Sequence, residues 1–531
     1  MIYFDAIIIG AGFSGLYQLH NFRDKLNLKS LVIEEGDDIG GTWYWNAYPG
    51  ARCDSESYSY GYTFSKEIYE NWKWKERYPK QKIILKYLNY VSKKLNLKKD
   101  ILLSHRVVRG MYLEKKNLWK VKTNKNKIFF CKYLISAVGS LSSANIPNIK
   151  GIKNFNGEWY HSGKWPKKFI NFKNKIVAQI GTGSSGIQIA PEIAKIAKKI
   201  VIFQRTPNYS IPARNSKLTK NFNKYIRKNY KKVKNLLKKT PGGHTFYFSK
   251  KSVFDFNEKK RNIIYEKAWK KGSLSFRATF KDITKTIKAN KTASKFIKNK
   301  ILSVVKNKKF AKILTNFDHP FTSKRPTLNT NYYETFNKKN VELVDLKANP
   351  IVKITKKGIK TNEKDYLFDK IIFATGFDAF TGSILNLNLT GKKNRKLKSL
   401  WKNGPKTYLG IMIPGFPNLF VVQGPGSPSV LTNVPVQIEQ HVEWITNCID
   451  YLEKNNKKKI EATTKSANIW NKKIMKLANA SLFMKAKSSW YKGDNIPGKP
   501  KIFIPYPGGM PKYRNICDKV RKNKYKQFKI N

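Results

Sequence analysis

Two short glycine-rich segments carry residue types that could bind nucleotides. Gly10-Ala11-Gly12-Phe13-Ser14-Gly15 and Gly181-Thr182-Gly183-Ser184-Ser185-Gly186 share one glycine spacing, and each follows an apolar run and precedes a helical pattern. In that context the glycines allow a tight turn and a close approach of the backbone to a pyrophosphate at a helix N-terminus. Two such units in one chain imply two bound nucleotides.

The residue at the end of the next strand differs between the two units. Glu34 and Arg205 each stand 19 residues after the last glycine of their segment. A carboxylate there accepts both ribose hydroxyls of an adenosine and repels a 2'-phosphate, whereas a cation pairs with that phosphate. The second unit is therefore expected to prefer NADPH over NADH.

Size and charge limit the class of protein. The chain has 531 residues with 40% apolar residues, enough for two or three domains with their own cores. Its net charge of +71 would favour nucleic acid or an anionic membrane as a partner. The lysines are spread along the whole chain, so we interpret the positive charge as a general bias in amino-acid composition and expect no specific nucleic-acid site.

The cysteines and the N-terminus argue against several other classes. Cys53, Cys131, Cys448 and Cys517 form no C-x-x-C pair, and no histidine cluster has zinc spacing, so we expect neither a redox dithiol nor a metal site. The N-terminus lacks a signal-peptide pattern, and no run of 18 apolar residues occurs. We expect a reduced, cytoplasmic protein without a transmembrane segment.

Two further motifs carry a family resemblance. The segment from Phe155 to Pro166 has the spacing F-x-G-x-x-x-H-x-x-x-W-P, set by Phe155, Gly157, His161, Trp165 and Pro166. It resembles the fingerprint of the Baeyer-Villiger monooxygenases, flavoproteins that insert one oxygen atom of O2 beside a ketone carbonyl. The segment 40–54 fills every fixed position of a second motif of that family, although Ala47 stands where an arginine is often found.

The resemblance implies FAD and NADPH as cofactors and a set of binding residues. The expected FAD contacts are Gly10, Gly12, Phe13, Ser14, Gly15, Glu34, Thr42, Trp43, Tyr44, Trp45, Asp54, Tyr60, Val108 and Val434. The expected NADPH contacts are Arg52, Cys53, Gly181, Thr182, Gly183, Ser184, Ser185, Gly186, Arg205, Thr206, Lys324 and Trp490. Trp490 belongs to a segment, 486–500, that resembles the mobile loop of the family.

The resemblance also assigns the catalytic residues. Lys324-Arg325-Pro326 lies in surroundings like those of the family's catalytic arginine, and Asp54 would orient the Arg325 guanidinium. A permanent cation there would keep a flavin peroxide anionic and able to attack a ketone, giving an ester or lactone. His161 could be a general base, but its place between Gly157 and Trp165-Pro166 favours a structural role in a hinge.

These patterns predict an α/β fold with two Rossmann-like dinucleotide-binding domains, for FAD and NADPH, and a helical insertion. The FAD domain is expected at 1–145 and 371–531, the linker and NADPH domain at 146–215 and 319–370, and the insertion at 216–318. The partners would be a small ketone and O2; the sequence determines neither the ketone nor the oligomeric state.

Two other functions remain open. The nearest is an N- or S-oxygenating flavin monooxygenase, whose related fingerprint lacks the Trp165-Pro166 pair. A basic nucleic-acid- or membrane-binding protein with a relic flavin fold is conceivable on charge alone. Salt-insensitive NADPH turnover by a yellow protein would argue against it, because binding to a phosphate backbone weakens steeply with salt.

Overall fold

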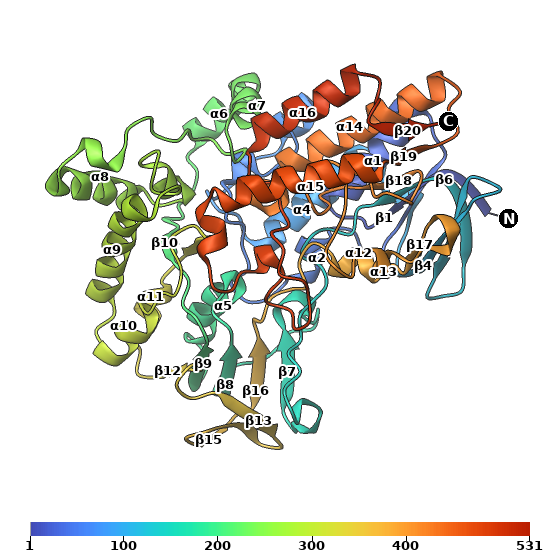
Figure 1. The fold of residues 1–531 in the computed structure, drawn as a ribbon. Coiled ribbons are helices and arrows are strands. Elements are labelled where there is room, and N and C mark those ends of the chain that lie inside the picture. The colour runs from blue at the N-terminus through green and yellow to red at the C-terminus, as the bar shows by residue number, and fades with distance from the viewer. Residues whose placement is uncertain (1) are drawn as a thin grey trace.

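The computed structural model describes residues 2–531 and contains two α/β units, each built on a mainly parallel sheet (Figure 1). The first sheet lies at the right of Figure 1 and the second at the bottom. Within residues 2–531, no helix combines the length and the apolar character needed to cross a membrane.

The first sheet places the strand before the first glycine segment at its centre. Its strand order is β17-β4-β5-β6-β1-β2-β3, with β18 also paired to β6. Residues 6–9 of β1 are buried because helices cover this sheet, as expected for an apolar parallel strand. The strands are β1 (Ile2–Ile9), β2 (Ser30–Ile33), β3 (Ile101–Leu102), β4 (Val107–Leu113), β5 (Leu118–Thr123), β6 (Ile128–Ser136), β17 (Leu389–Thr390) and β18 (Leu419–Val421).

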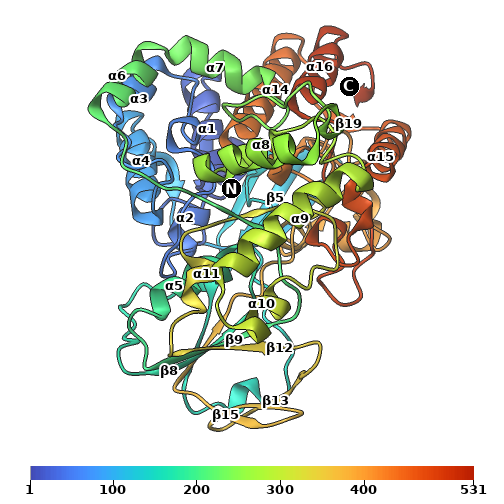
Figure 2. The ribbon, with the colours of Figure 1, turned by 90° about the vertical axis from the view of Figure 1, so that its left-hand side faces the viewer.

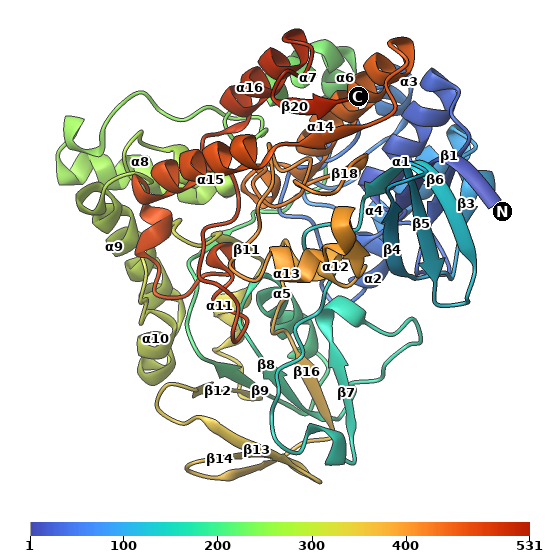
Figure 3. The same cartoon turned by 45° about the vertical axis from the view of Figure 1, so that its right-hand side comes forward.

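The first unit is assembled from both ends of the chain. Leu419 of β18 pairs with Leu134 of β6, and helix α1 (Phe13–His20) packs against α14 (Val434–Lys454). One hydrophobic core joins these segments to α4 (Gln81–Lys94), α15 (Thr464–Asn479) and α16 (Met510–Lys522). In Figure 3 the blue N-terminal strands and the orange and red C-terminal helices accordingly lie together.

The second sheet is wholly parallel and has the order β12-β9-β8-β16-β7. The fingerprint segment contributes to it directly, since its residues Glu158–His161 form the edge strand β7. Helix α5 (Ser184–Ile193) begins just after the second glycine turn. The remaining strands are β8 (Ile176–Ile180), β9 (Lys199–Gln204), β12 (Val341–Asp345) and β16 (Lys370–Phe373).

The region after residue 216 is helical, as its apolar spacing predicts, but it has no core of its own. Tyr230 and Leu237 of α7 pack with Tyr69 and Val436 of the first unit, whereas the later helices share the core of the second unit. Figure 2 shows α7 above the first unit and α9 above α10 and α11 (Tyr332–Thr335). The helices are α6 (Lys220–Lys228), α7 (Tyr230–Lys239), α8 (Glu258–Lys271), α9 (Ile287–Val304) and α10 (Lys308–Leu314).

Two chain segments run side by side between the units. Asn145 N–H donates to Gly376 C=O at 2.9 Å, and the Thr375 hydroxyl donates to Asn145 C=O at 2.6 Å.

The other short elements are α2 (Thr42–Trp45), α3 (Lys66–Asn71), α11 (Tyr332–Thr335), α12 (Gly382–Leu385), α13 (Leu397–Leu400), β10 (Ser210–Pro212), β11 (Thr327–Asn329), β13 (Ile351–Thr355), β14 (Gly358–Thr361), β15 (Asp365–Leu367), β19 (Ile460–Ala462) and β20 (Phe528–Ile530).

Candidate active site

The first glycine turn opens into an elongated cleft of about 330 Å³. Gly10 has a φ of +104°, a conformation that glycine adopts freely, and a side chain on Gly15 would collide with the carbonyl of Gly10. The spacing therefore fixes both the turn and the packing of α1 on β1. Expected residues that line the cleft are Gly10, Gly12, Phe13, Ser14, Glu34, Thr42, Trp43, Trp45, Tyr60 and Val434.

Glu34 lies at the edge of this cleft with both carboxylate oxygens held by the backbone. It accepts from Ala11 N–H at 2.6 Å and from Gly36 N–H at 2.8 Å. Burial raises the pKa of Glu34, and the two backbone donors partly oppose that effect. The carboxylate is thus oriented before any ligand binds.

Four of the expected FAD contacts do not line the cleft: Gly15 lies within α1, Asp54 lines a second pocket described below, and Tyr44 and Val108 have other partners. The Tyr44 hydroxyl donates to Asp37 at 2.6 Å, and the Lys167 ammonium lies 4.0 Å from the Tyr44 ring centroid. Val108 is one residue beyond the lining residue Val107, and its carbonyl accepts a hydrogen bond from Asn388 at 3.0 Å. Their contacts with a flavin nucleotide stay predictions.

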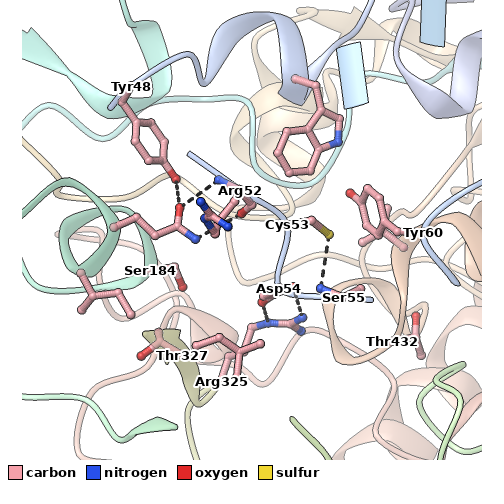
Figure 4. A pocket seen from close by; sticks show the side chains of 15 residues that line it. Tyr48, Arg52, Cys53, Asp54, Ser55, Tyr60, Ser184, Arg325, Thr327 and Thr432 are labelled. Atoms are coloured by element: carbon pink, nitrogen blue, oxygen red, sulfur yellow. Dashed lines mark hydrogen bonds and ion pairs between the residues drawn. The ribbon is translucent and has the colours of Figure 1, made fainter. Parts of the chain in front are cut away.

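Arg325 and Asp54 meet in a two-point ion pair between the two units (Figure 4). Arg325 Nε donates to Asp54 Oδ2 at 2.7 Å and Nη2 donates to Oδ1 at 2.9 Å. The third nitrogen, Nη1, donates to the carbonyl of Val430 at 2.6 Å. All three guanidinium nitrogens are thus engaged, so the planar cation is fixed in orientation.

The charge state of this pair is set by the two partners. Burial would raise the pKa of Asp54, but the Arg325 guanidinium outweighs it and the pKa is lowered. Burial would lower the pKa of Arg325, but Asp54 outweighs that effect and the pKa is raised. Both groups therefore stay charged throughout the neutral pH range.

A second, smaller pocket of about 130 Å³ adjoins the ion pair and connects the two glycine units. It is lined by Arg52, Cys53 and Asp54 of the first unit and by Ser184 of the second. Figure 4 shows Tyr48 and Ser184 on the same side of this pocket. The other members of the second turn, Gly181, Thr182, Gly183, Ser185 and Gly186, do not line it.

Gln188, on α5, links the two units by hydrogen bonds at this pocket. Its Oε1 accepts from the Tyr48 hydroxyl at 3.0 Å and from Arg52 N–H at 3.4 Å, and its Nε2 donates to Arg52 C=O at 3.1 Å. Sequence reasoning missed Gln188, because a glutamine on a helix carries no signal of a partner 136 residues away.

The expected 2'-phosphate residues lie near the second unit. Arg205 is exposed directly after β9, and Thr206 beside it is half-buried. Lys324 is mostly buried and only 3.9 Å from Asp318. Burial lowers the pKa of Lys324, and the charge of Arg205 lowers it further, so the two cations lie close enough to repel each other.

The fingerprint histidine is positioned as a structural group. His161 Nδ1 accepts a hydrogen bond from Gly163 N–H at 3.0 Å, and the ring meets Phe377 edge-on at 6.1 Å. Burial lowers the pKa of His161 to about 4, so the ring is neutral near pH 7. Phe155 and Trp165 are buried, and Trp165 N–H donates to Trp45 C=O at 3.4 Å, which ties the fingerprint to the first unit.

The segment 486–500 packs against the residues 377–380. Asn495 donates to Phe377 C=O at 2.9 Å, and Trp490 stacks on Phe380 with ring centroids 5.7 Å apart. Burial raises the pKa of the neighbouring Tyr491 to about 12, and the charges of Arg325 and Asp54 also act on it. Sequence reasoning singled out Trp490 and missed Tyr491.

Comparison with known proteins identifies the family. The flavin-binding monooxygenase-like family matches residues 5–258. Cyclohexanone 1,2-monooxygenase of Acinetobacter sp is 39% identical over 99% of this chain and 96% of that protein, and a Baeyer-Villiger monooxygenase of Pseudooceanicola batsensis is 38% identical over 98% and 95%. The chain belongs to the Baeyer-Villiger monooxygenases.

A solved structure supports the fold of this Baeyer-Villiger monooxygenase. The complex of OTEMO with FAD and NADP is 36% identical, covers 99% of both chains and has a TM-score of 0.96. The predicted α/β fold with two Rossmann-like domains and a helical insertion is therefore confirmed. One relative has another chemistry in its name: phenazine N-monooxygenase of Lysobacter antibioticus is 36% identical over 99% of this chain and 97% of that protein.

Proposed function

We propose that this protein is an FAD- and NADPH-dependent monooxygenase that converts a ketone into an ester or lactone. One oxygen atom of O2 enters the bond between the carbonyl carbon and a neighbouring carbon. The other oxygen atom leaves as water, for which NADPH supplies two electrons and one hydrogen as a hydride, and a proton supplies the second hydrogen. The observation that carries this proposal is the fixed, permanently charged guanidinium of Arg325 at the junction of the two units.

The residues of the first cleft suit FAD. The turn at Gly10 lets a pyrophosphate approach the start of α1, and Glu34 can accept from an adenosine ribose. The apolar faces of Trp43 and Tyr60 border the part of the cleft nearest the ion pair. When bound there, FAD supplies hydride acceptance from NADPH and the activation of O2.

The residues of the second unit suit NADPH. The charge of Arg205 lowers the pKa of Lys324, and a 2'-phosphate, which provides two negative charges, would offset the repulsion between these two cations. Ser184 at the N-terminus of α5 faces the pocket that also contains Asp54. A dinucleotide along this edge would place its nicotinamide end toward Arg325.

Arg325 acts by stabilising negative charge and not by transferring a proton. A guanidinium does not give up a proton at neutral pH, so it stabilises negative charge on the activated oxygen and on the carbonyl oxygen of the substrate. An unprotonated oxidant is nucleophilic and attacks a carbonyl carbon. Asp54 holds the guanidinium plane, and Val430 holds its third nitrogen, so no reorientation is needed during the reaction.

N-oxygenation is the second candidate, because the phenazine N-monooxygenase is almost as similar as the ketone monooxygenases. Electrophilic transfer to nitrogen or sulphur requires a protonated oxidant, which a neighbouring fixed cation disfavours. The test is turnover under ¹⁸O2 of cyclohexanone mixed with an equal amount of thioanisole. Ester oxygen labelled with ¹⁸O as the main product supports the proposal, whereas sulphoxide alone supports the alternative.

A further inference from the structure

An arginine of the insertion lies close enough to the Arg325–Asp54 pair for the charges of both residues to act on its pKa. Arg277 belongs to the short 3-10 helix Leu274–Ala278, which follows α8. Its guanidinium carbon lies 5.9 Å from the Phe246 ring centroid, and His244 stacks on the same ring at 5.4 Å. A Cβ on Gly242 would be only 2.9 Å from Arg277 Nη2, so the guanidinium rests against the backbone of this loop.

One loop connects the two arginines. Val430 C=O accepts from Arg325 Nη1 at 2.6 Å, and three residues later Asn433 N–H donates to Gly242 C=O at 2.7 Å. Gly242 is the residue against which Arg277 rests. The Arg325 guanidinium therefore bonds the segment 429–433, which lies immediately before α14. The Arg277 guanidinium packs against backbone that is hydrogen-bonded to the same segment.

The polar groups around Arg277 are short of partners. Among residues 2–531, Arg277 Nε and His244 Nε2 are buried without a hydrogen-bond partner, and so is Asn433 Oδ1. Burial lowers the pKa of Arg277 to about 10, with a further contribution from Arg325, so it remains charged at pH 7. Burial lowers the pKa of His244 well below its usual range, so His244 is neutral.

The charges in this region do not balance. Arg277 and Arg325 are both positive, and Asp54 is the carboxylate that acts on both, but its two oxygens already accept from Arg325. A buried cation without a hydrogen-bonded anion is costly, because the protein does not replace the water that it loses. The cluster thus carries one excess positive charge and free donors.

We propose that Arg277, with His244 beside it, binds a carboxylate group on the substrate, so that the natural substrate is a keto acid rather than a neutral ketone. This inference rests on the proposed ketone oxygenation and adds the substrate class. Arg277 supplies planar N–H donors that match a carboxylate, and His244 can donate one more hydrogen bond. Arg325 remains free to act at the carbonyl end of the same molecule.

The nucleotide phosphates are a poorer match for this site. The groups in contact with Arg277 belong to the loop 242–246, which hydrogen-bonds to the segment before α14. The candidate phosphate residues Arg205 and Lys324 form another pair of cations, since the charge of Arg205 lowers the pKa of Lys324. Two distinct anions are therefore expected at two distinct places.

The test compares Arg277→Gln with wild type on 4-oxocyclohexanecarboxylate and its methyl ester. Wild type should favour the acid in kcat/KM, and Arg277→Gln should lose about ten- to a hundredfold on the acid with little change on the ester. Arg261→Gln is the matched control: it removes the same charge from α8 of the insertion, where Arg261 bonds Phe256 C=O. It should behave as wild type.

A binding measurement separates this inference from the proposed function. Isothermal titration of the FAD- and NADP⁺-loaded protein with cyclohexanecarboxylate should give a Kd that Arg277→Gln raises about ten- to a hundredfold and Arg261→Gln leaves unchanged. If no ketone is oxygenated but this difference appears, the proposed reaction fails and the anion site stands. Equal affinity in wild type and Arg277→Gln, equal use of acid and ester by wild type, or weaker NADPH binding in Arg277→Gln would overturn the inference.

Discussion

The preference for NADPH over NADH is predicted to depend on Arg205 and Lys324 together. Both would face the 2'-phosphate, but their surroundings differ: Arg205 is exposed, whereas the Lys324 side chain is 16% exposed. A charge-assisted hydrogen bond contributes about 1.5–3 kcal/mol when desolvated and about 1 kcal/mol or less at an exposed site. We therefore assign about 1 kcal/mol to Arg205 and about 2 kcal/mol to Lys324.

These values convert into ratios of kcat/KM for NADPH over NADH. Arg205→Gln should lower the ratio about fivefold, Lys324→Gln about thirtyfold, and the double variant about 150-fold if the two contributions are independent. Steady-state NADPH and NADH oxidation with a saturating ketone measures each ratio. NADH turnover should change little, because NADH has no 2'-phosphate.

Lys347→Gln is the matched control for this series. Lys347 is a cation beside the same carboxylate, Asp318, at 3.4 Å, but its side chain is 40% exposed and so contributes less than the buried Lys324. Its removal should leave the NADPH to NADH ratio within about twofold of wild type. A double variant with an unchanged ratio, or a Lys347→Gln effect as large as that of Lys324→Gln, would refute the assignment of the phosphate site.

Two further predictions concern the ion pair and a buried carboxyl group. Asp54→Asn removes the charge that holds Arg325 and should lower ester formation at least about tenfold while FAD stays bound. Product analysis measures the ester and flavin absorbance measures bound FAD. Unchanged ester formation would contradict the orienting role of Asp54. Glu439 accepts from Phe64 N–H at 2.9 Å and from the Thr63 hydroxyl at 2.6 Å, and burial followed by the charge of Glu443 raises its pKa to about 7. Since its folded pKa lies above the ordinary glutamate value of 4.5, the folded state binds the proton more tightly, so stability contributed by this group is present below about pH 4.5 and lost as the pH rises through about 7. Glu439→Gln should therefore gain thermal stability relative to wild type between pH 5 and pH 8, by up to about 3 kcal/mol, and a difference in melting temperature that does not grow with pH would contradict this.

Local spacing predicted the nucleotide turns well because it depends on nearby backbone sterics. Gly10 and Gly15 are constrained by the same strand, turn and helix, so the motif predicts the turn wherever a strand precedes it. The meeting of Arg325 and Asp54 was implied by family resemblance alone. Nothing local relates two side chains that are 271 residues apart.

Arg277, Gln188 and Tyr491 could not be found in the sequence for the same reason. Arg277 is one of many cations, and its position depends on how the insertion folds over the segment 429–433. Tyr44 also lies within a recognised motif, but its hydroxyl donates to Asp37, its ring contacts Lys167 and it does not line the cleft, so its contact with FAD stays a prediction. Helical periodicity predicted helices after residue 216, but it did not indicate which of them would reach the site.

The central claim is that the fixed cation of Arg325 is required for oxygen transfer to a ketone but not for reduction of the flavin. The direct measurement is anaerobic stopped-flow reduction of FAD by NADPH together with aerobic ester formation, in wild type and in Arg325→Ala. In Arg325→Ala we expect reduction to persist within about tenfold, ester formation to fall below detection, and the electrons to be lost as hydrogen peroxide. Ester formation by Arg325→Ala at the wild-type rate would contradict it.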